Sequence, residues 1–242
     1  MNEAEFLKSY DAAAFEPYAV TVDLVLISII DDQLVTLVKR RTQHPEIGKW
    51  ALPGGFVGTD ENLDEAALRV LRTKTSLDDI WLEQLYSFGN PKRDPRMRVI
   101  SVAYFALLPD HVVEDALKRD PGLKLASILT HDLTDANDCA GLQIEGEGKV
   151  DTAFDHAEML GVAVKRLRGK LNYTPIALAL LPDRFTLRAL QTIHETILDT
   201  SFNKPAFRRR MLDSGMIEGT GEREPAGGAY RPAELYQRKP QT

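Results

Sequence analysis

The sequence predicts a mixed α+β fold in two parts: an α/β/α sandwich with a mixed sheet, then a small helical domain that closes with a β-hairpin. In residues 1–153, several apolar segments of strand length alternate with two helical segments, as expected for helices packed on a sheet. Residues 154–172 form one amphipathic linking segment, and residues 173–242 hold short helices and a glycine-rich stretch. We therefore divide the chain into these three ranges.

Composition places the chain among ordinary globular proteins. Of its 242 residues, 43% are hydrophobic and 27% are charged. Its single cysteine, Cys139, excludes an internal disulfide and a cysteine metal cluster. The N-terminus lacks the apolar core of a signal peptide, and no apolar run is long enough to span a bilayer. We expect a cytoplasmic protein without a membrane partner.

Charge is distributed unevenly along the chain. The net charge is −6, but residues 151–242 carry 14 basic and 11 acidic side chains, which leaves 16 basic against 25 acidic in residues 1–150. A basic C-terminal part behind an acidic N-terminal part suggests contact with a polyanion. A solvated surface would give the same counts, so the charge alone does not decide.

The first two strands are expected at residues 20–30 and 34–40, joined by a turn at residues 31–33. The first begins with alternating apolar residues and ends as an apolar run. Arg40 and Arg41 close the second strand. They form either a charged strand end or a contact for the phosphates of a ligand.

The stretch ALPGGFVGTDENLDEAALRVLRTKTSL, residues 51–77, organises the N-terminal part. Gly54 and Gly55, before Phe56, allow the backbone to bend and a ligand to approach closely. The helix that follows has an apolar packing face at Leu63, Ala67, Val70 and Leu71.

This stretch resembles the Nudix box of pyrophosphohydrolases, because Gly55, Glu61 and Arg69 stand at the spacing of that motif. Three glutamates of the motif are replaced, by Val70, Thr73 and Lys74, and Ser76 replaces its last glycine. Clustered carboxylates would be needed to hold a magnesium ion beside a diphosphate. We therefore expect a Nudix fold that binds a nucleotide, has no metal site and is not an enzyme. Glu61, Asp64 and Glu65 remain as weak candidate ligands.

Further strands are expected at residues 80–88, 99–108 and 124–130, with a helix at 111–119 and a loop at 132–150. The loop at residues 90–98, NPKRDPRMR, is basic and leads into a central strand. Arg98 is its best candidate for a ligand contact, with a solvated hairpin as the alternative. His156 begins the amphipathic helix expected at residues 154–171, either as a ligand contact or as a structural residue.

The C-terminal part has the pattern of a winged helix-turn-helix. One helix is expected after Thr186, which can act as N-cap, and a second at residues 204–213, with Pro205 in its first turn. A glycine-rich hairpin follows. The second helix, KPAFRRRMLD, would enter the major groove of DNA. A helical dimerisation or docking module is the alternative.

Basic residues of this part are the candidate DNA contacts. Because Phe207 and Met211 set the buried side of the second helix, Arg208 and Arg209 are better placed to face DNA than a third arginine. The full candidate set is Lys204, Arg208, Arg209, Arg210 and, in the hairpin, Arg231.

Six motifs together resemble those of NrtR proteins, the Nudix-related transcriptional regulators of bacterial NAD biosynthesis. They are KWALPGGFV, RVISVAYFALL, AFDHAEML, FTLRALQ, FRRRML and YRPAELY. The resemblance covers nearly the whole chain. It implies a homodimeric repressor that binds a palindromic double-stranded operator and requires no cofactor. It also implies that ADP-ribose or a related NAD metabolite binds the Nudix domain and weakens DNA binding. The expected effector contacts are Arg40, Arg41, Gly54, Gly55, Phe56, Glu61, Arg98 and His156.

Three alternatives remain open. The chain could be a hydrolase of ADP-ribose or a nucleotide sugar, a regulator that responds to a sugar such as arabinose, or an effector-binding protein whose tail only dimerises. Neither the operator, the target genes nor the choice between repression and activation follows from the sequence.

Overall fold

The computed structural model describes residues 2–131, 133–134, 138–225 and 232–240. Its larger sheet has the strand order β5-β6-β1-β2-β7-β8-β9, while β3 pairs with β2 and β4 with β1. β1 and β6 run parallel and the other neighbours are antiparallel, so the sheet is mixed as predicted. The strands are β1 Ala19–Ile30, β2 Gln33–Arg40, β3 Trp50–Ala51, β4 Gly54–Phe56, β5 Glu83–Phe88, β6 Val99–Leu107, β7 Leu123–Leu129, β8 Gly141–Ile144 and β9 Gly148–Val150.

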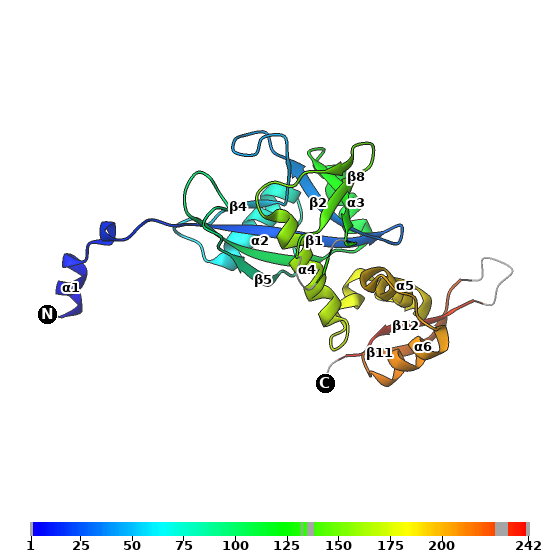
Figure 1. The fold of residues 1–242 in the computed structure, drawn as a ribbon. Helices are drawn as coiled ribbons and strands as arrows, with labels where there is room; N and C mark the ends of the chain where they lie inside the picture. The colour runs from blue at the N-terminus through cyan, green and yellow to red at the C-terminus, as the bar shows by residue number, and fades with distance from the viewer. Residues whose placement is uncertain (1, 132, 135–137, 226–231, 241–242) are drawn as a thin grey trace.

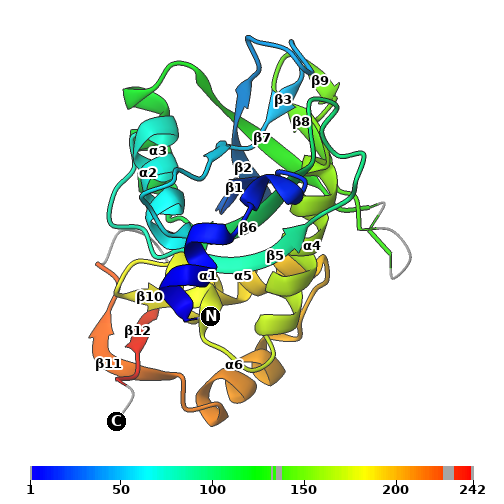
Figure 2. The same ribbon diagram turned by 90° about the vertical axis from the view of Figure 1, so that its left-hand side faces the viewer.

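Helices cover both faces of this sheet (Figures 1 and 2). Alternate residues of β1 point to opposite faces. Leu24 and Leu26 lie in one core with helices α2, Leu63–Thr75, and α3, Asp110–Arg119. Val25 and Ile27 lie in the other core with helix α4, His156–Lys170. The predicted α/β/α sandwich is confirmed.

The region of residues 132–150 corrects the prediction of a loop, because β8 and β9 form a hairpin at the sheet edge. Leu142 and Ile144 are buried and Gln143 between them is exposed, a strand alternation too short to stand out in a polar segment. The turn uses Gly146 and Gly148, both at positive φ.

The linking helix also begins later than predicted. Phe154 adopts a positive φ of 50° and Asp155 is the N-cap, so α4 starts at His156. The strand expected from residue 80 likewise starts at Glu83.

The C-terminal part is a winged helix, as predicted. Its helices are α5, Leu187–Leu198, and α6, Lys204–Asp213, and its three-stranded sheet has the order β10-β12-β11. Thr186 caps α5 by accepting a hydrogen bond from the amide of Ala189 at 3.1 Å. The strands are β10 Phe185–Thr186, β11 Ile217–Arg223 and β12 Glu234–Arg238, and the 3₁₀ helix η2 Ile176–Leu180 precedes them.

The winged helix packs directly on the sandwich. Leu190 and Ile197 of α5 and Phe207 of α6 belong to the same apolar cluster as Met159 and Leu160 of α4. At the far end of α4, Arg168 donates from Nε to the Ile197 carbonyl at 2.8 Å and from Nη2 to Thr130 Oγ1 at 3.3 Å. One helix therefore touches both parts of the chain.

The N-terminus extends away from the sandwich (Figure 1). It holds helix α1, Glu3–Ser9, with a capping box between Asn2 and Glu5, and the short 3₁₀ helix η1, Ala12–Ala14. Neither contains a buried residue. None of the helices in the described ranges has the length and apolar character needed to cross a bilayer.

Candidate functional site

A cleft of about 450 Å³ opens at the end of β2, between the segment from β3 to β4 and the last turn of α2. It brings together the predicted residues Arg40, Arg41 and Gly54 with Lys74 of the Nudix-like box. The lining residues are Lys39, Arg40, Arg41, Thr42, Gln43, Ala51, Leu52, Pro53, Gly54, Lys74 and Gly122.

The two arginines of the cleft are held by backbone and aromatic contacts. Arg40 donates from Nε to the Gly48 carbonyl at 3.0 Å and lies over the Trp50 ring. Arg41 donates from Nε to the Pro45 carbonyl at 2.8 Å, and its guanidinium lies 4.8 Å from the centre of the Phe154 ring. Burial, followed by the neighbouring Arg96, lowers the pKa of Arg41.

The two lysines differ in their partners. Lys39 is paired with Asp120, with Nζ and Oδ2 2.5 Å apart. Lys74 is exposed in the last turn of α2 and has no hydrogen bond or ion pair with any described residue. No carboxylate is among the described residues that line the cleft. The cleft is therefore suited to an anion such as a diphosphate.

The glycines are required by close packing inside the protein. A Cβ on Gly54 would lie 2.0 Å from Asp23 Oδ1, since β4 pairs with β1 at this position. A Cβ on Gly55 would lie 3.1 Å from Val70 Cγ2 of α2. The close packing of β4 against β1 and against α2 is therefore enough to require both glycines, without any ligand.

The carboxylates that remain in the Nudix-like box are engaged by the protein itself. Glu61 accepts hydrogen bonds from Arg69 Nε at 2.8 Å and Nη2 at 2.6 Å, and the Arg69 contact lowers the pKa of Glu61 to about 2. Tyr104 donates to Asp64 at 2.6 Å, and Glu65 accepts from the Asn62 amide at 2.8 Å.

These contacts do not fit the metal site that the Nudix fold implies. The described ranges contain no cluster of three or more His, Cys, Asp or Glu side chains that could hold an ion. A divalent cation needs several free oxygen ligands on one side. Each of the three carboxylates instead has a structural partner. Glu61 binds Arg69 and the Gly58 amide, Asp64 binds Tyr104 of β6, and Glu65 binds the amide of the N-cap Asn62.

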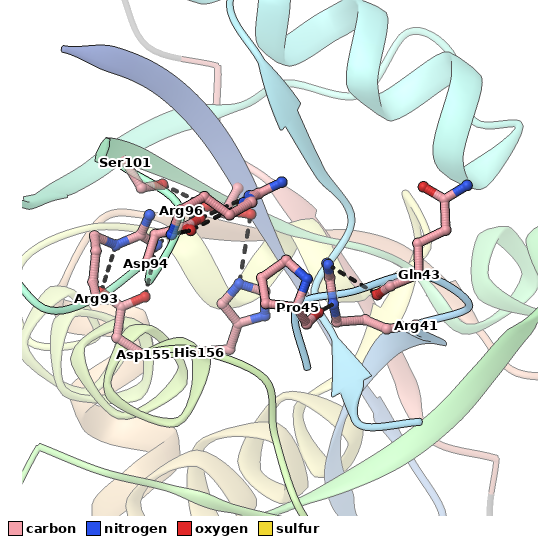
Figure 3. Close-up of polar contacts among 10 residues, drawn as sticks. Arg41, Gln43, Pro45, Arg93, Asp94, Arg96, Ser101, Asp155 and His156 are labelled. Atoms are coloured by element: carbon pink, nitrogen blue, oxygen red, sulfur yellow. Dashed lines mark hydrogen bonds and ion pairs between the residues drawn. The ribbon is translucent and has the colours of Figure 1, made fainter. Parts of the chain in front are cut away.

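A buried polar cluster joins β1, the loop before β6 and the start of α4 (Figure 3). Arg93 binds Asp155 through two hydrogen bonds, Nε to Oδ2 at 2.8 Å and Nη2 to Oδ1 at 2.7 Å, and Nη2 lies 3.8 Å from Asp23 Oδ2. Ser101 donates to Asp23 Oδ2 at 2.5 Å. Only 4% of the Arg93 side chain is exposed, so its charge depends on these carboxylates.

His156 belongs to this cluster and holds the cleft wall. Its Nδ1 accepts a hydrogen bond from the Leu52 amide at 2.9 Å, and its Nε2 lies 3.7 Å from Asp23 Oδ1. Burial lowers the pKa of His156, which keeps the ring neutral. The structural reading of His156 fits this geometry, because the ring does not line the cleft.

The remaining predicted contacts, Phe56 and Arg98, lie outside the cleft lining. Phe56 is 47% exposed and Arg96 lies over its ring, with 5.4 Å between guanidinium and ring centre. Arg98 lies over the Tyr18 ring, and its buried Nη1 has no hydrogen-bond partner among the described residues.

Asp23, Arg93 and Asp155 were not among the site residues predicted from the sequence. A charged residue inside the apolar strand at residues 20–30 was the available signal for Asp23. Arg93 was hidden among the other basic residues of the loop at 90–98, where Asp94 holds Arg96 by hydrogen bonds of 3.0 and 2.7 Å.

On the winged helix, the three arginines of α6 face different surroundings. Arg209 is exposed and has no partner among the described residues. Arg208 reaches β12, where it lies 3.4 Å from Glu234, and Arg210 lies over the rings of Phe202 and Phe207. Lys204 is exposed in the first turn, and Arg231 lies outside the described residues. Arg209 is therefore the arginine freest to meet a polyanion.

Comparison with known proteins identifies both parts of the chain. Residues 17–136 match the NUDIX domain family, and residues 177–237 match the family described as the NrtR DNA-binding winged helix domain. The "ADPR responsive transcriptional repressor NtrR" of Acinetobacter baylyi is 38% identical over 237 residues, covering 97% of this chain and 88% of the relative. This chain belongs to the NrtR family.

Two further relatives bear on the NrtR assignment. The crystal structure of Shewanella oneidensis NrtR complexed with a 27mer DNA superposes with a TM-score of 0.73 at 32% identity, over 91% of this chain and 93% of that one. An ADP-ribose pyrophosphatase of Methanocaldococcus jannaschii is 35% identical over 103 residues, 41% of this chain and 59% of the relative. The predicted NrtR resemblance is confirmed, and the second relative matches less than half of this chain.

Proposed function

We propose that this NrtR-family chain is a homodimeric transcriptional repressor that leaves its palindromic operator when ADP-ribose binds the Nudix domain. The single observation that carries the proposal is the combination, in one chain, of a cationic cleft and a winged helix that presents Arg209. The name of the Acinetobacter baylyi relative supports ADP-ribose as the effector. The DNA complex of Shewanella oneidensis NrtR supports operator DNA as the partner. We propose that residues 1–153 bind the effector, residues 154–172 link the two parts, and residues 173–242 bind DNA.

The effector's diphosphate is expected to bind where Arg40, Arg41 and Lys74 line the cleft. Charged N–H groups hold phosphate oxygens more strongly than neutral donors do. Phe56, at the end of β4, and Arg98, which immediately precedes β6, remain our candidates for contacts with the rest of the ligand, although neither lines the cleft.

Helix α4 provides the connection between the two sites. At its start, His156 accepts a hydrogen bond from the amide of Leu52, which lines the cleft, and near its end Arg168 contacts α5. Effector binding that moves Leu52 would displace the start of α4 and, with it, the winged helix. Coupling is reciprocal, so operator DNA must weaken ADP-ribose binding by the same factor.

A second candidate function is an ADP-ribose pyrophosphatase, which the Methanocaldococcus jannaschii relative favours. The occupied carboxylates of Glu61, Asp64 and Glu65 weigh against it. We propose that the Nudix domain binds without cleaving. Release of AMP and ribose phosphate from ADP-ribose in the presence of Mg²⁺ or Mn²⁺ would favour the hydrolase instead.

The function is tested by titrating fluorescent DNA from upstream of the chain's own gene with the protein at fixed salt. Saturating ADP-ribose should weaken operator affinity by about 5- to 150-fold, the usual range of allosteric coupling. Unchanged affinity would keep the DNA-binding role and reject ADP-ribose, and arabinose and other nucleotides would then be tested in the same assay. A protein with no specific DNA binding would be a hydrolase or a dimerising effector-binding protein.

A further inference from the structure

The cleft gathers positive charge where a diphosphate-binding Nudix fold is expected to hold a divalent cation. We infer that this chain binds its diphosphate ligand without a metal ion, and that the ammonium group of Lys74 supplies the positive charge that the ion would bring. The inference rests on the proposed function and specifies the chemistry of its effector site.

The donor set of the cleft is the first argument. Its described lining holds four cationic side chains and no carboxylate. A magnesium ion bound there would lack oxygen ligands and would be repelled by Lys74, Arg40 and Arg41. A diphosphate placed there would instead find donors on two sides, at the end of β2 and at the end of α2.

The availability of Lys74 is the second argument. Lys39 is neutralised by Asp120, and Arg40 and Arg41 each use Nε on a backbone carbonyl. Lys74 contacts no described residue by hydrogen bond or ion pair, so its three N–H donors are available to a ligand.

The carboxylates that could have held an ion form the third argument. Glu61 is fixed by Arg69 and by the Gly58 amide, and its low pKa of about 2 reflects the first of these contacts. Asp64 and Glu65 accept from Tyr104 and Asn62. Recruiting these three groups to a cation would require breaking contacts that fix the box itself.

The test is calorimetric titration of the full-length protein with ADP-ribose, once in EDTA and once in Mg²⁺. The variants are Lys74→Ala and the control Arg72→Ala, which removes an exposed cation of the same helix that is paired with Asp78 and does not line the cleft. Inorganic pyrophosphate, titrated in EDTA, is a second probe that contains only the diphosphate.

The inference predicts equal ADP-ribose affinity of the native protein in EDTA and in Mg²⁺. Lys74→Ala should weaken binding by about 10- to 100-fold in both conditions, the effect of losing a charge-assisted hydrogen bond, while Arg72→Ala binds like the native protein. Binding by the native protein that requires Mg²⁺, or an unaffected Lys74→Ala variant, would overturn it.

The two proposals fail in different ways. If ADP-ribose does not bind in either condition but pyrophosphate binds in EDTA and depends on Lys74, the cationic site stands and the proposed effector is wrong. If neither compound binds in EDTA, the metal-free site is rejected.

Discussion

Arg93 and Asp155 form a buried bidentate ion pair that ties the loop before β6 to the start of α4, with N–O distances of 2.8 and 2.7 Å. Removing Asp155 would leave the buried Arg93 guanidinium without its two short hydrogen bonds and with Asp23, 3.8 Å away, as its remaining ion-pair partner among the described residues. Asp155→Ala should therefore lower the free energy of unfolding by about 3–5 kcal/mol. Urea denaturation measures this change.

The exposed pair of Glu114 and Lys118 on α3 is the matched control, since both side chains are more than half exposed. Glu114→Ala should change the free energy of unfolding by about 0–1 kcal/mol, as for other surface ion pairs. Equal effects of the two substitutions would show that Arg93 and Asp155 do not act as a buried pair.

Arg168 should transmit effector binding to the winged helix, because it joins α4 to the Ile197 carbonyl of α5 and to Thr130. Arg168→Met should leave ADP-ribose affinity in the absence of DNA nearly unchanged. It should reduce the coupling between ADP-ribose and operator by about 0.5–2 kcal/mol, the range seen for residues along coupled networks. Operator titrations with and without ADP-ribose measure the coupling.

Arg166→Met is the control for that experiment. Arg166 lies on the same helix but contacts the Leu85 carbonyl and Glu83 of β5. It should retain full coupling. Loss of coupling in both variants would indicate general disruption of α4 instead of a specific role of Arg168.

Arg209 should contact DNA directly, since it is the arginine of α6 without a partner in the described ranges. If it meets a phosphate, Arg209→Ala should weaken binding to all DNA sequences and reduce the salt slope of log K by about 1. If it reads a base, the loss should be restricted to the operator, at about 1–3 kcal/mol. Arg72→Ala, in the Nudix domain, should change neither quantity.

Stability should fall in mild acid because of His156. Burial lowers its folded pKa below the unfolded value of about 6.5, so the unfolded chain binds a proton more readily. The stabilisation that comes from keeping His156 neutral is therefore fully present above pH 6.5 and is lost as the pH falls through the folded pKa. Asp23 and Asp155 oppose the shift, and Arg93 and Arg41 add to it.

His156→Asn should flatten the decline in unfolding free energy below pH 6.5, measured by urea denaturation over a pH series. His194, whose pKa burial also lowers, accounts for the part that remains. A native profile that is flat below pH 6.5 would contradict the burial argument.

Local pattern was enough to predict the framework of the molecule. The strand at residues 20–30 and the helix Lys204–Asp213 follow from periodicity, a cap and a proline, all of which act within a few residues. Phe207 and Met211 are buried as the helical spacing predicted. The hairpin of β8 and β9 was not predicted, because its strands are short and contain few apolar residues.

The site depends on contacts between distant residues, which the sequence pattern does not contain. Arg93 and Asp155 are 62 positions apart, and the Leu52 amide that fixes His156 is 104 positions away from it. The orientation of Arg210 over Phe202 and Phe207 depends on how α5 and α6 pack. In contrast, the spacing of the Nudix box alone was enough to show that positions 70, 73 and 74 lack its carboxylates.

The most direct test of the account follows DNA release and effector consumption in one sample. Labelled DNA from upstream of the gene is bound by the protein in the presence of Mg²⁺, ADP-ribose is added, and anisotropy and AMP are recorded over time. The account predicts that anisotropy falls and stays low while no AMP forms, because the effector is bound and not cleaved. Anisotropy that does not fall, or that recovers as AMP accumulates, would contradict it.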